Sequence, residues 1–253
     1  MRSEPPIPHA VPLTVLDELD IRESGAPTRD GVRQVSSQRL FLQLHVFTGC
    51  FQPKALLEPL RASGLEAVVY HDFNDPTGIG ILFLTEDPSD LTSKLRNLFS
   101  MQPLVGLRRK PEFTMIGRTY STGREPKLED SLLVKPRRNV LNSKFPWAIW
   151  YPLRRKAEFY LLPKPDQGRI LGEHGIIGRA YAEAGYANDI RLACFGLDVN
   201  DNEFVIGLVG DDLYPLSRLI QDMRRTEQTA KYLESIGPFF VGKVFWQSPM
   251  RLV

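Results

Sequence analysis

One histidine of this chain stands among glycines in a way that could serve chemistry. His174 lies at the centre of LGEHGIIGR, residues 171–179, and glycines recur every third residue at Gly172, Gly175 and Gly178. Small residues at that spacing leave one face of a helix bare, so a flat ligand could approach the backbone with the imidazole beside it. His174 could equally be a packed core residue that hydrogen-bonds a neighbour. The residues alone leave both interpretations open.

The rest of the chain offers no second ligand for a metal site. The other candidates are His9, His45, His71, Cys50 and Cys194. The three histidines lie in a proline-rich start, an apolar run and a strand end, so we expect them to be structural or solvated. The cysteines lack CxxC spacing, which excludes a zinc ribbon and argues against a disulfide framework. Because a haem needs only one protein ligand on its proximal side, His174 fits a haem better than zinc or non-haem iron.

Composition and motifs exclude several classes of protein. The 253 residues are 42% hydrophobic and 25% charged with a net charge of +2, as in a globular protein without strong attraction to nucleic acid or anionic membranes. The chain contains no phosphate-binding GxxxxGK[ST], no GxSxG and no HExxH. No stretch approaches the roughly 20 apolar residues of a membrane-spanning helix, and the start lacks a secretory signal pattern. We therefore expect a cytoplasmic protein without a nucleic acid partner or stable membrane insertion.

The elements that would position His174 follow an order that occurs twice. In the first half we expect strand 39–47, helix 53–64, strands 66–73 and 78–86, helix 88–100 and strand 107–120. In the second half we expect strand 147–153, helix 164–185, strands 188–198 and 202–210, helix 211–235 and strand 238–247. Alternating apolar residues predict the strands, and apolar residues three or four apart predict the helices. The predicted fold class is therefore α+β, with two tandem ferredoxin-like (βαββαβ) units and antiparallel sheets.

The same patterns divide the chain into four segments. Residues 1–37, rich in proline and charge, are expected to form a flexible N-terminal arm that cannot order itself alone. Residues 38–122 make the N-terminal ferredoxin-like domain, 123–145 a basic linker, and 146–253 the C-terminal domain that carries His174.

Five blocks of the second half resemble a known family. They are WYPLRRKAEFYLLP, EHGIIGRAYA, GLD with NEFVIGL, MRRTEQTAKY and GPFFVG, in matching order and spacing over roughly residues 146–246. In these blocks the chain resembles the chlorite dismutase-like haem proteins, and within them most of all the coproheme decarboxylases. The N-terminal half resembles them only in its predicted order of elements. The resemblance implies that the C-terminal domain binds haem.

The resemblance implies a role for three residues around the iron. His174 matches the proximal ligand of the haem iron. Glu227 matches the carboxylate that hydrogen-bonds the free nitrogen of that histidine, and Gln228 is an alternative because one length difference intervenes. Tyr151 matches the tyrosine that carries a radical during decarboxylation.

It also implies roles for several charged residues. Arg155 stands where the decarboxylases have a basic residue facing a propionate, and Arg137 where they have an arginine fourteen positions before the tyrosine. A solvated basic surface is the alternative for both. The family places a distal glutamine or arginine where this chain has Asp189, and Arg191 follows two residues later on the same strand face. Either side chain could face the iron, Arg191 to polarise bound peroxide or Asp189 to repel anions such as chlorite. The methionine usual two residues after the tyrosine is Leu153 here.

The implied activity is peroxide-dependent oxidative decarboxylation of iron coproporphyrin III to haem b, so the porphyrin is both substrate and cofactor. The expected partners are this iron porphyrin, hydrogen peroxide and further copies of the chain, since the family commonly assembles as pentameric rings. The alternatives are a chlorite dismutase, which converts chlorite to chloride and dioxygen, and a non-enzymatic haem-binding protein. Tyr151 argues against chlorite dismutation.

Overall fold

The described chain, residues 19–251 of a computed structural model, contains the predicted strands and helices with two differences. Residues 23–36 form two further strands, and the prediction of one helix over 211–235 is wrong, because two helices end there in a strand at Leu233–Ile236. The strands are β1 (Glu23–Pro27), β2 (Arg33–Ser36), β3 (Phe41–Thr48), β4 (Glu66–Asp72), β5 (Ile79–Thr85), β6 (Arg108–Arg109), β7 (Met115–Arg118), β8 (Trp147–Arg155), β9 (Asn188–Ala193), β10 (Phe204–Gly210), β11 (Leu233–Ile236) and β12 (Phe240–Gln247). The helices are α1 (Leu57–Ala62), α2 (Asp90–Ser100), α3 (Lys135–Val140), α4 (Glu158–Leu161), α5 (Lys164–Glu183), α6 (Leu213–Met223) and α7 (Glu227–Tyr232), with shorter helical turns η2 (Pro53–Leu56), η3 (Leu104–Gly106), η4 (Pro111–Phe113) and η5 (Asp130–Val134). Among these residues no helix is both long and apolar enough to cross a membrane.

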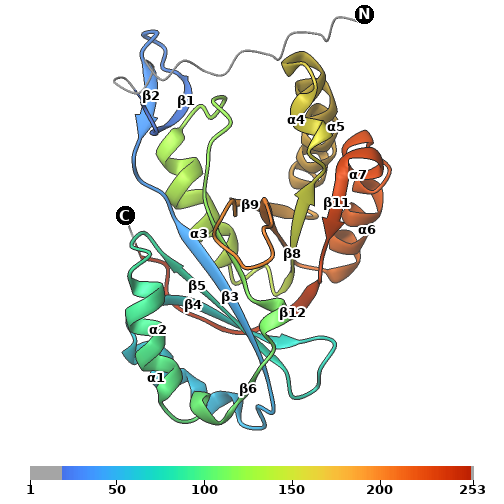
Figure 1. Ribbon diagram of the computed structural model, residues 1–253. Coiled ribbons are helices and arrows are strands. Elements are labelled where there is room, and N and C mark those ends of the chain that lie inside the picture. The colour runs from blue at the N-terminus through green and yellow to red at the C-terminus, as the bar shows by residue number, and fades with distance from the viewer. Residues whose placement is uncertain (1–18, 252–253) are drawn as a thin grey trace, which may run out of the picture.

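Each half has the β-α-β-β-α-β order, so the predicted α+β class with two ferredoxin-like units is confirmed. The first half runs β3, α1, β4, β5, α2 and β7, and the second runs β8, α5, β9, β10, α6 and β12. The two sheets do not stay separate: β12 of the second half pairs with β4 of the first, and β9 meets β7. Together with the pairing of β8 and β10, these contacts close the antiparallel strands into a barrel (Figure 1).

Alternating residues of each strand point into the barrel or out toward the helices. On β3, Leu42 and Leu44 point inward and are each 1% exposed, in one cluster with Trp150 of β8 and Phe240 of β12. The two large rings need space on neighbouring strands. A Cβ at Gly207 would collide with the Trp150 ring, so glycine at that position is required by the packing.

Helices cover two stretches of the outer face. α1 and α2 pack on the first half, where Phe47, Phe83 and Leu95 belong to one buried cluster. α5 and α6 cover the outer face of β8, β9 and β10 at the other side of the barrel (Figure 1). This second layer contains Tyr151 and the helix that carries His174.

Residues 123–145, the basic linker of the sequence interpretation, contain η5 and α3 and contribute to the core. Leu128, Leu132 and Leu133 are at most 2% exposed and lie in the same cluster as the barrel interior. Most of the charged residues of this segment are exposed, whereas Arg137 is buried. The segment therefore both connects the halves and fills the barrel.

Part of the predicted N-terminal arm, residues 23–36, forms the hairpin of β1 and β2. Polar contacts attach it to the chain that follows β7. Ser121 Oγ donates to Glu23 Oε2 at 3.1 Å, and the Ala26 N–H donates to the Glu125 carbonyl at 2.9 Å. Composition could not predict this attachment, because it uses hydrogen bonds instead of apolar area. The remainder of the arm, residues 1–18 with His9, lies outside the described residues.

His45 on β3 predicts a loss of stability in acid. Burial, with the charge of Arg109, lowers the pKa of its imidazole from 6.5 to about 4. Its ring meets Phe99 edge-on at 5.0 Å between centroids, and its Nε2 has no hydrogen-bond partner within the described chain. The unfolded chain therefore takes up a proton near pH 6.5 while the folded protein resists until about pH 4. We expect this residue alone to reduce the unfolding free energy by about 2 kcal/mol between pH 7.5 and pH 5.

Urea denaturation of wild type and His45→Phe at both pH values measures this contribution. The variant should lose less stability than wild type on acidification, by about the same 2 kcal/mol. His71→Phe, at an exposed strand position, is the matched control for the exchange of histidine for phenylalanine. An unchanged pH dependence in His45→Phe would contradict the assignment.

Candidate functional site

Strand register brings the predicted catalytic residues to one face of the sheet. On the outer face of the barrel, Tyr151 of β8 is opposite Ile206 of β10, and Ile206 is opposite Arg191 of β9. Neighbouring strands are about 4.8 Å apart, so the Cα atoms of Tyr151 and Arg191 are separated by roughly 10 Å. Asp189 occupies the next outward position along β9, opposite Leu208. The structure therefore brings together Tyr151, Asp189 and Arg191.

The surface around Tyr151 is largely apolar and lies under α5 and α6. Ile177 and Tyr181 of α5 and Met223 at the end of α6 pack in the same cluster. Tyr151 is 7% exposed, and its ring stacks on Phe239 with 4.7 Å between centroids. Burial raises the pKa of the phenol far above its usual value. Tyr151 therefore keeps its proton throughout the physiological range.

His174 lies on the buried side of α5 and is uncharged. Its Nε2 is 3.2 Å from Thr229 Oγ1 and 3.4 Å from Thr226 Oγ1, at the start of α7. Its Nδ1 is buried and has no partner among residues 19–251. Burial, and next the charge of Arg155, lower the pKa of the imidazole to about 4, while Glu173 opposes the shift. A neutral imidazole with an unused ring nitrogen is the form that ligates a metal, so His174 fits an iron porphyrin chemically.

The glycines near His174 are arranged differently from the sequence expectation. At about 100° per residue, Gly172 lies about 160° around the helix from His174, Gly175 about 100° and Gly178 about 40°. A Cβ on Gly172 or Gly175 would meet no atom within 4 Å, and one on Gly178 would meet Met223 at 3.8 Å. Only Gly178 shares the side of His174, and the other two leave an open flank of α5.

Glu227 is not a neighbour of the imidazole. Its carboxylate accepts hydrogen bonds from Arg169 at 2.8 Å and Lys231 at 3.2 Å, and these partners lower its pKa. Gln228 is buried within α7, 5% exposed. The polar atoms that reach His174 belong to Thr226 and Thr229, one residue before and two after Glu227. Their spacing of three places both hydroxyls on one face of a helical turn, which is a signal that the sequence contained.

The two candidate arginines have different surroundings. Arg155 is on the outer face of β8 with Tyr151, four residues further along the strand, or roughly 13 Å. Arg137 is 4% exposed and is paired with Glu66 and Glu86, each at 2.8 Å. The structure does not bring Arg137 to His174 or Tyr151. Its guanidinium instead connects α3 to β4 and to the residue after β5.

This buried ion pair predicts a large stability change. Arg137→Met leaves the Glu66 carboxylate, 3% exposed, without its cation, so we expect a loss of about 3–5 kcal/mol in unfolding free energy. The neighbouring Arg138 is the matched control, because its ion pair with Asp130 is 3.5 Å long and exposed. Arg138→Met should cost about 0.5 kcal/mol or less. Urea denaturation measures the unfolding free energy of both variants. Equal losses would show that the buried Arg137 pair stabilises the fold no more than the exposed Arg138 pair does.

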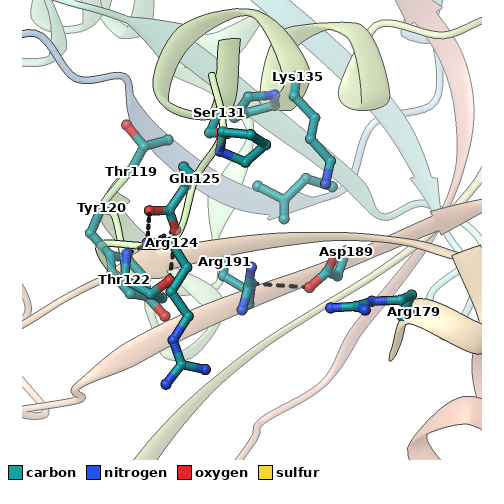
Figure 2. A pocket seen from close by; sticks show the side chains of 13 residues that line it. Thr119, Tyr120, Thr122, Arg124, Glu125, Ser131, Lys135, Arg179, Asp189 and Arg191 are labelled. Atoms are coloured by element: carbon teal, nitrogen blue, oxygen red, sulfur yellow. Dashed lines mark hydrogen bonds and ion pairs between the residues drawn. The ribbon is translucent and has the colours of Figure 1, made fainter. Parts of the chain in front are cut away.

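Asp189 and Arg191 both line one cavity of about 320 Å³, and neither His174 nor Tyr151 belongs to its lining. The Arg191 Nε lies 3.1 Å from Asp189 Oδ2, so neither side chain faces the cavity alone. Figure 2 shows this ion pair between Arg124 and Arg179, with Lys135 above it on the far wall. Sequence reasoning missed these three cations and Tyr120, although Arg179 closes the HGIIGR block.

Comparison with known proteins finds relatives of this chain. The family model described as chlorite dismutase matches residues 90–245. Coproheme decarboxylases from two strains of Thermus thermophilus are each 29% identical over 148 residues, which are 54% of this chain and 57% of each relative. The alignment thus spans little more than half the length of these relatives.

Solved structures share the fold over most of the chain. A haem-binding protein from Thermus thermophilus superposes with a TM-score of 0.64 at 22% identity, covering 82% of this chain and 93% of that one. Chlorite dismutase from Candidatus Nitrospira defluvii in complex with imidazole gives a TM-score of 0.63 at 15% identity, covering 85% and 93%. Because the family model covers more than half of the residues, the chain belongs to the chlorite dismutase family.

Proposed function

We propose that the protein binds an iron porphyrin between α5 and the outer face of β8, β10 and β9, and converts coproheme to haem b with hydrogen peroxide. The observation that carries the proposal is His174, a neutral and half-buried imidazole whose buried Nδ1 has no partner among residues 19–251, on the helix that packs over Tyr151. The related coproheme decarboxylases and the haem-binding structural neighbour support the same ligand class.

In this proposal each residue has a defined task. The bound iron porphyrin supplies, together with hydrogen peroxide, the oxidising chemistry. His174 would hold the iron through a ring nitrogen. Tyr151 gives up a hydrogen atom from its protonated phenol and then takes one from the β-carbon of a propionate. The propionate loses carbon dioxide and a second electron and becomes a vinyl group. Overall, propionate, hydrogen peroxide and a proton give a vinyl group, carbon dioxide and two molecules of water.

The ion pair of Asp189 and Arg191 favours a peroxide reaction over chlorite dismutation. An arginine without a carboxylate partner would attract an anion such as chlorite. At 3.1 Å, Asp189 offsets the charge of Arg191. Hydrogen peroxide is uncharged, so its binding does not depend on the net charge of this pair. Chlorite is an anion, so its attraction to Arg191 is weakened by Asp189.

Adding hydrogen peroxide to the purified protein with iron coproporphyrin III tests the proposal, with absorption spectra and mass analysis of the porphyrin. We expect carbon dioxide release and conversion of two propionates to vinyl groups. A bound porphyrin that stays unchanged would identify a haem carrier, and dioxygen release from chlorite would identify a chlorite dismutase.

Assembly as a homo-oligomer in the cytoplasm is part of the same proposal, by resemblance to the family. Light scattering on the purified protein measures its mass. A monomeric mass would contradict this part without affecting the proposed reaction.

A further inference from the structure

Two aromatic rings hold the guanidinium of Arg155. Its Cζ lies 4.9 Å from the centroid of the Phe159 ring and 4.5 Å from that of Phe204. Phe159 belongs to α4, which stands beside α5 at the end of β8 (Figure 1), and it is 1% exposed. Rings packed on a guanidinium favour it through cation–π attraction and remove most of its rotamer freedom. The side chain is therefore held before any ligand arrives.

A tyrosine and a glutamate set the direction of that guanidinium. Tyr160 Oη accepts a hydrogen bond from Arg155 Nη1 at 3.4 Å and donates one to Glu203 Oε2 at 2.8 Å. Glu203 also accepts the backbone N–H of Arg155 at 3.2 Å, and its own N–H donates to the Leu153 carbonyl at 3.0 Å. Burial and the bond to Glu203 raise the pKa of Tyr160 to about 12, so its hydroxyl keeps its proton.

This arrangement leaves the charge of Arg155 available. Within residues 19–251, no carboxylate oxygen lies within 4.0 Å of its guanidinium nitrogens, whereas the preceding Arg154 pairs with Asp201 at 3.6 Å and Glu234 at 3.2 Å. The Tyr160 hydroxyl lies between Arg155 and Glu203, so it fixes the direction of the cation without a direct ion pair. A held guanidinium with no direct carboxylate partner is suited to an incoming carboxylate, which it can bind through two parallel hydrogen bonds.

We propose that Tyr160 and Glu203 are positioning residues that hold Arg155 to receive a carboxylate of the porphyrin. The inference rests on the proposed function and adds to it the specificity for a porphyrin with free carboxylates. Tyr160 lies on α4, outside the residues that the family resemblance assigns. Its effect on the ligand passes entirely through Arg155.

A double-mutant cycle tests this directly. Iron coproporphyrin III and its tetramethyl ester are titrated by absorption into wild type, Tyr160→Phe, Arg155→Ala and the double variant. Tyr160→Phe should weaken binding of the free acid about fivefold, as expected for one hydrogen bond, and leave the ester unaffected. In the Arg155→Ala background the same change should have no further effect. Glu203→Gln keeps an acceptor for the Tyr160 hydroxyl and should bind the free acid nearly as wild type does.

Tyr214→Phe is the matched control, because Tyr214 is 70% exposed on α6. Thermal unfolding of each variant shows whether it is folded. Equal losses for acid and ester, or an undiminished loss in the Arg155→Ala background, would overturn the inference and leave the proposed function standing. If wild type binds neither porphyrin, the proposed function itself fails, and the inference fails with it.

Discussion

Tyr151→Phe should bind coproheme as wild type does and release no carbon dioxide when peroxide is added. Phenylalanine keeps the stack on Phe239 and the packing under α5, so the fold and the porphyrin site are preserved. It cannot form a phenoxyl radical, so the hydrogen atom of the propionate β-carbon has no acceptor. Within the described chain the Tyr151 hydroxyl makes no hydrogen bond to another residue, and we expect the unfolding free energy to change by less than about 1 kcal/mol. Carbon dioxide release and mass analysis of the porphyrin measure the result.

Tyr181→Phe is the control for this experiment. Tyr181 lies in the same cluster, but its hydroxyl donates to Asp222 at 2.7 Å, so its phenol is engaged outside the proposed reaction. We expect that variant to keep decarboxylating. Full carbon dioxide release by Tyr151→Phe would exclude Tyr151 as the radical carrier. Loss of activity in both variants would show that removal of either hydroxyl disturbs the site, so the result would not assign the radical to Tyr151.

His174→Gly should lose the iron–nitrogen bond and with it the spectrum of a histidine-ligated porphyrin. Glycine at this position has no side chain that could bind the iron in place of the imidazole. Free imidazole should fit the space left by the side chain and restore the Soret band, as an external copy of the lost ligand. Absorption spectra with and without imidazole measure this.

Thr229→Val provides the matched control. It removes the hydroxyl 3.2 Å from His174 Nε2 and keeps the imidazole and the size of the neighbour. Iron should stay ligated in that variant. A His174→Gly spectrum identical to wild type, with the fold intact by circular dichroism, would show that another group binds the iron.

The order of the elements could be predicted because its signals are local. Leu42, Leu44 and Val46 alternate with outward residues over one strand, and this period appears within a few residues of sequence. The helix around His174 was predicted in the same way, and α5 spans Lys164–Glu183. Closure of the barrel could not be predicted locally, because β12 pairs with β4 across most of the chain. An edge strand presents the same unpaired backbone groups to any partner strand, so its sequence does not identify the strand with which it pairs.

The features of the candidate site also differ in whether the local sequence could predict them. The sequence by itself determined the residue types: one histidine in a helix, a tyrosine in an apolar strand, and charges two residues apart on another. Only the tertiary structure determined which residues each of these side chains contacts. Arg137 pairs with Glu66 and Glu86, which precede it by 71 and 51 residues, and therefore does not contribute to the candidate site.

Glu227 shows the physical reason. The sequence left open whether Glu227 reaches His174 and which of Asp189 and Arg191 faces the iron. In the structure Glu227 bonds Arg169, 58 residues earlier, and Asp189 and Arg191 join at 3.1 Å in one cavity. Periodicity determines the face on which a side chain lies. Which charge Glu227 then meets depends on non-local packing, because its partner Arg169 lies on another helix. Asp189 and Arg191 are two residues apart on one strand face, so their contact is local.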